Sequence, residues 1–157
     1  MPTRKLKYQK YLDEFPSCPP IHYKTLAKNA FRWVFHNQLS ESFIPLNSIK
    51  EPPQRILDES DLMCKGFGLS FFDTYAHACL RYEALYKRKR GLSHQDFIIE
   101  KGDSIAELEM TEKEGIFGDI NEGNGHFTFH EFENIDLIKN VLVIEDLLEG
   151  RVGFPIF

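Results

Sequence analysis

The clearest pattern of hydrophobic and polar positions is a helical one that begins near residue 74. Large or apolar side chains recur there at three- and four-residue spacing, at Tyr75, Ala78/Cys79, Tyr82 and Leu85/Tyr86. Asp73 or Thr74 can cap the start of this helix. The basic run 87–90 and the following Gly91 suit its end, where cations face the negative end of the helix dipole. The sequence therefore predicts one long helix from about 74 to 90.

A period of two replaces the helical period later in the chain. Residues 104–111 alternate, with Ala106, Leu108 and Met110 on one face and Ile105, Glu107 and Glu109 on the other. Short apolar runs predict further strands at 66–72, 96–100, 125–133 and 141–145. Four glycines within residues 114–125 predict a loop between two of these strands.

The two periods compete between Ile21 and His36. Tyr23, Leu26, Ala27, Ala30, Phe31 and Val34 follow helical spacing, whereas Phe31, Trp33 and Phe35 alternate as in a strand. We expect a helix to about Asn29 and a strand from Ala30 to His36, with one continuous helix as the alternative. Residues 1–20 end in a proline-rich stretch that predicts an arm laid over the domain. Residues 37–66 have no clear period and are predicted to be irregular.

These elements predict the fold class. Helices come early, strands come late, and one strand–helix unit joins them, which favours an α+β domain with a mainly antiparallel sheet. The chain has 157 residues, and we expect a single domain over 1–157 in which 1–20 form an N-terminal arm. The long helix is expected at its centre, with a helical segment before it. The 14 phenylalanines, against one tryptophan, indicate a phenylalanine-rich core.

Charge is distributed unevenly along the chain, whose net formal charge is −5. Residues 1–99 carry 15 basic and 10 acidic side chains, and residues 100–149 carry 3 basic and 14 acidic ones. The acidic section 100–149 is therefore a candidate surface for a basic protein partner. The basic section offers a weak positive surface, which makes nucleic acid an unlikely partner although a nucleic-acid-associated domain stays an alternative.

Apolar runs and cysteines bear on compartment and membrane association. The basic N-terminus is not followed by the apolar region of a secretory signal, and no stretch of about 18 apolar residues predicts a membrane-spanning helix. Cys18, Cys64 and Cys79 are widely spaced and form no C-x-x-C pair. A reducing, cytoplasmic setting is the simplest expectation.

Candidate metal and phosphate motifs are weak. His126 and His130 are four residues apart, but in a strand their rings would lie about 13 Å apart at ~3.3 Å per residue, too far to share a metal. We therefore assign no metal site. The glycine-rich phosphate loops G-x-x-x-x-G-K-[ST] and G-x-G-x-x-G are absent from the sequence.

Several polar residues interrupt the apolar strands. Arg32 lies between Phe31 and Trp33, where a charged group is costly unless its guanidinium meets water or an anion. One interpretation is a structural salt bridge to a strand glutamate. The other is that Arg32 binds a phosphate bidentately, while a glutamate holds a ribose hydroxyl or acts as a base.

In chain order, these pieces resemble the ADP-ribosyltransferase-like group. That fold carries an Arg or His on an early strand, a hydroxyl-bearing strand that runs into a helix, and a late glutamate, often as E-x-E after a flexible loop. The matching positions are Arg32, Ser70 within Gly68–Phe72, and Glu131 and Glu133. The resemblance implies that Arg32 contacts the NAD diphosphate and Ser70 lines the nicotinamide pocket. It implies a catalytic role for Glu133 or Glu131, and the pair Glu107 and Glu109 competes for that role.

The sequence thus leaves three functions open and does not establish that the protein is an enzyme. The first expectation is a protein-interaction or regulatory domain that uses its acidic section. The alternatives are an NAD-binding, ADP-ribosyltransferase-like enzyme or toxin, and a nucleic-acid-associated domain. The NAD alternative requires Arg32, Ser70 and a glutamate to meet in one cleft.

Overall fold

One six-stranded sheet organises the computed structural model, which describes residues 4–88 and 94–147. Its strands lie in the order β4-β5-β2-β1-β3-β6, and every neighbouring pair is antiparallel. The strands are β1 Lys28–Val34, β2 Leu69–Phe72, β3 Ser104–Met110, β4 Gly115–Phe117, β5 His126–Glu131 and β6 Val141–Asp146. This arrangement confirms the predicted α+β class and the antiparallel sheet.

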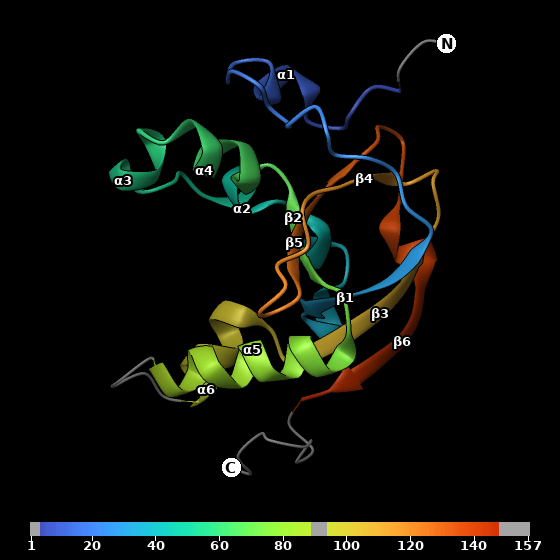
Figure 1. The fold of residues 1–157 in the computed structure, drawn as a ribbon. Helices are drawn as coiled ribbons and strands as arrows, with labels where there is room; N and C mark the ends of the chain where they lie inside the picture. Colours follow the sequence, from blue (N-terminus) through green and yellow to red (C-terminus); the bar gives the residue numbers. More distant parts are fainter. Residues whose placement is uncertain (1–3, 89–93, 148–157) are drawn as a thin grey trace.

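The sheet is strongly curved, so it has a concave and a convex face (Figure 1). A single apolar cluster fills the concave face and joins residues of both halves of the sheet, among them Phe71, Phe127 and Phe129 on one side and Ala106 and Leu108 on the other. The Phe71, Phe117, Phe127 and Phe129 rings stack or meet edge to face, with centroids 5.0–5.9 Å apart. The abundance of phenylalanine therefore serves this core.

Two helices cover the convex face over β2, β1 and β3. The longer one is α5, Tyr75–Arg88, and the other is α6, His94–Lys101 (Figure 1). Tyr82 is fully buried between them, with its ring 4.9 Å from that of Phe97, and Trp33 donates its indole N–H to the carbonyl of Ala78 at 3.0 Å. The predicted helix is thus present from Tyr75 to Arg88, lying along one face of the sheet; residues 89 and 90 lie outside the described residues.

Two local predictions are wrong. The strand expected at 96–100 is part of helix α6, because the buried Phe97 packs against Tyr82 and a five-residue apolar run does not distinguish a strand from a helix turn. The helix expected before Asn29 is absent. Residues 28–34 instead form a seven-residue ladder with β3, from Lys28 opposite Met110 to Val34 opposite Ser104.

Short helices occupy the segments predicted to be irregular or to form an arm. They are α1 Gln9–Leu12, η1 His36–Gln38, η2 Glu41–Phe43, α2 Leu46–Ile49, α3 Gln54–Leu57 and α4 Ser60–Gly66, with η3 Leu137–Asn140 before β6. The arm lies beside the end of β5, where Leu6 pairs with Phe132. In the described residues, 4–88 and 94–147, no helix is both long and apolar enough to cross a bilayer.

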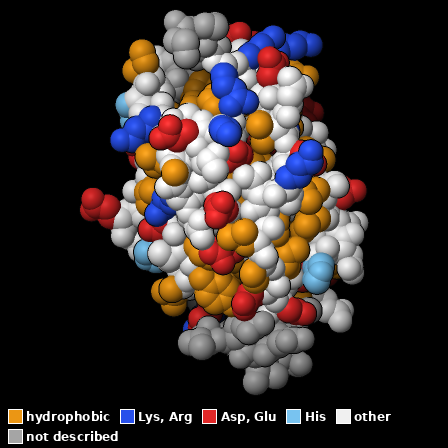
Figure 2. Space-filling model, turned by 90° about the vertical axis from the view of Figure 1, so that its right-hand side faces the viewer, with side chains coloured by type: hydrophobic (Ala, Val, Ile, Leu, Met, Phe, Trp, Pro, Cys, Tyr) orange, Lys and Arg blue, Asp and Glu red, His pale blue; other side chains and the backbone are white. Residues whose placement is uncertain are grey.

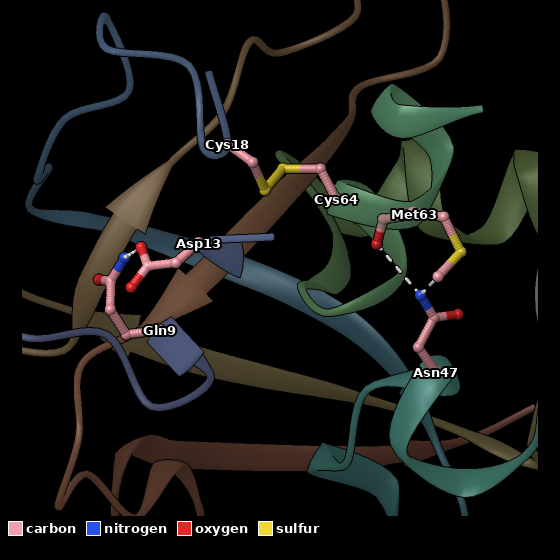
Figure 3. The surroundings of a disulfide bond; sticks show 6 residues. All are labelled: Gln9, Asp13, Cys18, Asn47, Met63 and Cys64. Atoms are coloured by element: carbon pink, nitrogen blue, oxygen red, sulfur yellow. Dashed lines mark hydrogen bonds between the residues drawn. A yellow bond between two sulfur atoms is a disulfide. The ribbon is translucent and has the colours of Figure 1, made fainter. Parts of the chain in front are cut away.

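A disulfide between Cys18 and Cys64 ties the N-terminal arm to α4 (Figure 3). Cys79, on α5, is not part of a disulfide. The sequence spacing gave no sign of this pairing, since 46 positions separate the two cysteines. Disulfides persist mainly in oxidising compartments. The disulfide therefore removes the support for a reducing setting, and the cytoplasmic location stays a prediction.

Candidate functional site

A cleft of about 380 Å³ opens on the convex side, between α2 and the α5–α6 pair. This volume lies within the range of roughly 300–1,000 Å³ that is typical of small-molecule sites. Its walls combine apolar and charged side chains: Arg32, Trp33, Phe35, Glu41, Ser42, Ile44, Leu46, Ile49, Ser70, Phe72, Arg81, Leu85, Glu100, Lys101 and His126. The cleft thus brings together Arg32 and Ser70, two of the three groups that the NAD alternative requires.

The strands beneath the cleft separate, and Arg32 occupies the opening. β1 pairs with β3 over seven residues but with β2 only at Phe31 opposite Phe72. Arg32 Nε donates to the carbonyl of Ser42 at 2.9 Å, and Nη1 donates to the carbonyl of Ser70 at 2.7 Å. Its guanidinium thereby replaces part of the missing β1–β2 ladder and borders the cleft.

Arg32 keeps donors for a ligand. A guanidinium has five N–H groups, and two of them make the hydrogen bonds to Ser42 and Ser70. The other three have no hydrogen-bond partner among the described residues. Burial lowers the pKa of Arg32 to about 10, an effect that the charge of Glu131 opposes. Arg32 is therefore still a cation near neutral pH. Among the described residues, no strand glutamate forms a salt bridge with it.

Ser70 and His126 form a hydrogen-bonded pair at the floor of the cleft. The β2–β5 register sets Ser70 opposite Thr128 and Phe72 opposite His126, so the Ser70 and His126 side chains share the convex face. Ser70 Oγ and His126 Nε2 are 3.0 Å apart. Burial lowers the pKa of His126 below its ordinary value, and the charges of Lys65, Arg81 and Arg32 lower it further. His126 is therefore neutral near pH 7 and can accept the hydroxyl proton of Ser70.

Two further cations line the cleft from the helices. Arg81 on α5 makes no ion pair or hydrogen bond with any part of the chain that is described, and Lys101 ends α6 with its Nζ 3.4 Å from a Glu100 oxygen. The carboxylates in the cleft wall are Glu41 and Glu100. With Arg32 included, cations outnumber carboxylates, so the cleft suits an anionic ligand.

The glutamates that the resemblance selects lie elsewhere. Glu131 is buried on the concave side, where its Oε2 accepts a hydrogen bond from Lys7 Nζ at 2.8 Å. Burial raises its pKa, and Lys7 and Arg32 oppose that effect. Glu133 follows the end of β5 and is exposed. Neither side chain lines the cleft.

The competing pair also lies outside the cleft. Glu107 and Glu109 project from β3 on the convex face. Asn29 donates a hydrogen bond to Glu107 Oε2 at 2.9 Å. Among residues 4–88 and 94–147, no group of three or more His, Cys, Asp and Glu side chains is arranged to hold a metal ion. The acidic members of the cleft are therefore Glu41 and Glu100, which sequence patterns did not select.

Sequence reasoning also missed His126 and Arg81 as cleft residues. The pairing of His126 with Ser70 depends on a register between strands 56 residues apart, which no local pattern reveals. The one signal in the sequence was strand alternation. His126 and Thr128 alternate with Phe127, so His126 faces away from the core that buries Phe127.

Comparisons with known proteins gave no relative. No family model, no curated protein and no solved structure matches the chain.

Proposed function

We propose that the cleft binds a small phosphate-bearing molecule, and that NAD is this molecule. The observation that carries the proposal is the position of Arg32, a cation fixed by two backbone carbonyls with three N–H groups left for a ligand. Arginine is well suited to phosphate because its planar donors can bind two oxygens at once. Arg81 and Lys101 add positive charge from the opposite wall.

The choice of NAD rests on the ADP-ribosyltransferase-like resemblance. That resemblance rests on an early arginine strand, a hydroxyl strand leading into a helix, and a late glutamate after a flexible loop. Arg32 and Ser70 supply the first two in one cleft, whereas the late glutamates do not line it. The corresponding β1, β2 and β5 are neighbours in the sheet, and β2 leads directly into α5. Arg32 would hold the diphosphate and Ser70 would line the nicotinamide pocket. We assign no catalytic role to Glu131 or Glu133, because neither borders the cleft.

The proposal predicts that millimolar NAD raises the melting temperature, because a ligand that binds only the folded state stabilises it. Arg81→Gln is expected to weaken NAD binding about 10-fold, in line with the loss of one charge-assisted hydrogen bond. Arg55→Gln, on the exposed α3, is the matched control and should bind as the wild type does. Equal affinity in the Arg81 and Arg55 variants would argue against the cleft as the site.

A second candidate function is docking of a basic protein segment on the acidic section. Figure 2 shows hydrophobic side chains gathered with acidic ones over the lower half of one face. Leu142 and Val143 on the edge strand β6 are 53% and 45% exposed. A shallow pocket beside them is lined by Phe31, Tyr75, Ile105, Glu107, Val143 and Glu145. Exposed apolar side chains ringed by carboxylates fit a partner that is both basic and apolar.

This second candidate predicts salt-sensitive binding of a fluorescent lysine–leucine peptide. Glu107→Gln together with Glu109→Gln should weaken binding several-fold at low salt, and 0.5 M salt should reduce the difference because exposed charges are screened. The control is Glu122→Gln, an exposed glutamate of the glycine-rich loop. Fluorescence anisotropy gives the affinities, and equal values for all three proteins would exclude this surface.

A further inference from the structure

We propose that Ser70 and His126 form a nucleophile–base pair that cleaves the diphosphate of the ligand held by Arg32. The substrate class, a nucleoside diphosphate ester, rests on the proposed function. The reactivity of the pair rests on its own geometry. This activity differs from transfer of ADP-ribose, since it breaks a phosphoanhydride bond and needs no glutamate in the cleft.

The first support is the geometry of the pair. The 3.0 Å separation of Ser70 Oγ and His126 Nε2 is within the hydrogen-bond reach that a general base requires. Ser70 is exposed although it lies in the middle of the sheet, and both residues line the cleft. A reacting phosphate in the cleft can therefore approach the hydroxyl.

The second support is the protonation state of the imidazole. The positive charges of Lys65, Arg81 and Arg32 and the burial of the ring all act against a proton on His126. A neutral imidazole can take a proton from a serine, whereas a protonated one cannot. The cations that attract the phosphate thus also hold the histidine in the state that activates Ser70.

The third support is that cations surround the expected position of the phosphate. Arg32 Nη1 donates a hydrogen bond to the backbone carbonyl of Ser70, so the remaining N–H groups of the guanidinium lie close to the attacking residue. Cationic clamps of this kind stabilise the charge that develops on a transferring phosphoryl group. Arg81 and Lys101 supply further charge in the same cleft.

The reaction proceeds in two balanced steps. Ser70 Oγ bonds to one phosphorus, the anhydride P–O bond breaks, and the hydroxyl proton passes to His126 and from there to the departing phosphate. Water then attacks the phosphoserine ester with His126 as base, the P–Oγ bond breaks, and Ser70 regains a proton. One water is consumed, and two monophosphates are released.

A fluorophosphonate probe tests the nucleophile directly, because it forms a P–O bond to an activated serine and releases fluoride. We expect one adduct, mapped by mass spectrometry to Ser70, and none in Ser70→Ala. His126→Gln should slow labelling at least about 100-fold, the scale of general-base catalysis. Ser60→Ala, at an exposed serine of α4, should label as the wild type does. Adducts spread over several serines, or an unchanged rate in His126→Gln, would overturn the proposal.

Two measurements on the same preparations separate this inference from the proposed function. Incubation with NAD should release nucleoside monophosphates from the wild type and not from Ser70→Ala, with both proteins melting at similar temperatures. If NAD binds but Ser70 is neither labelled nor needed for release, the nucleophile fails and the binding function stands. If Ser70 is labelled but NAD neither binds nor is cleaved, the proposed ligand and substrate class fail.

Discussion

Replacing both Cys18 and Cys64 with alanine is expected to lower the free energy of unfolding by about 4 kcal/mol, the loop-entropy value for a disulfide closing a loop of this length. The disulfide joins positions 46 residues apart, and it links the N-terminal arm to α4. Around it, Leu6, Leu12, Met63, Phe67 and Phe132 form a separate small apolar cluster. Without the disulfide, the arm is held by this cluster, by its backbone pairing beside Phe132 and by the ion pair between Lys7 and Glu131.

Denaturant unfolding of the wild type and the double variant measures this loss. Cys79→Ala is the control, because it removes a thiol and leaves the disulfide intact. Dithiothreitol should reduce the stability of the wild type and of Cys79→Ala, and it should leave the Cys18→Ala/Cys64→Ala protein unchanged. A double variant as stable as the wild type would show that the disulfide does not hold the arm in place.

Acidification from pH 7 to pH 4 is expected to destabilise the protein by about 3 kcal/mol through His130 alone. Burial lowers the pKa of His130 to about 4, below its ordinary value of 6.5. The side chain is 2% exposed, and neither ring nitrogen has a hydrogen-bond partner among the described residues. Since the folded pKa lies below the unfolded one, the stabilisation is complete above pH 6.5 and is lost as the pH falls toward 4.

The pH dependence of His130→Leu isolates this contribution. Glu131 has a raised pKa and therefore acts in the opposite direction on acidification, whereas His126 acts in the same direction as His130. These effects are shared by the wild type and the variant, so the difference between the two stability curves reports His130. We expect the variant to lose less stability between pH 7 and pH 4, and parallel curves would contradict a neutral, buried His130.

The sequence predicts best those elements whose hydrophobic spacing favours the same structure as their packing in the fold. The alternation of Ala106, Leu108 and Met110 with Glu107 and Glu109 matches β3, and the apolar stripe beginning at Tyr75 matches α5. Residues 21–36 show the opposite case. Their helical spacing is real, but seven pairings with β3 stabilise a strand from Lys28, and local propensity does not include that energy.

The candidate site shows a related limit. Arg32 and Ser70 were selected from the sequence and share the cleft. The residue selected from β5, Glu131, lies on the opposite face of that strand. Phe127, Phe129 and Glu131 have the parity of the concave face, whereas His126 has the parity of the cleft. The E-x-E motif draws attention to Glu131, which has the parity of the core. Arg32 has that parity too, since it pairs with Ala106, and it reaches the cleft only through the opening between β1 and β2.

The remaining features depend on pairings between distant segments. The disulfide between Cys18 and Cys64 and the opening between β1 and β2 both result from the way the chain closes on itself. Neither leaves a local signature, because each depends on which segments become neighbours. Only the folded chain shows that Arg32 fills the opening and faces a cationic cleft.

The most direct test of the central claim is isothermal titration of NAD into the wild type and Arg32→Lys. Lysine keeps the positive charge but loses the planar fork that donates to two carbonyls and that, in our proposal, also binds a phosphate. We predict a single NAD site in the wild type and at least about 10-fold weaker binding in Arg32→Lys, the cost of one good charged hydrogen bond. No heat of binding at millimolar NAD, or equal affinity in the two proteins, would contradict the assignment of the cleft as an NAD site.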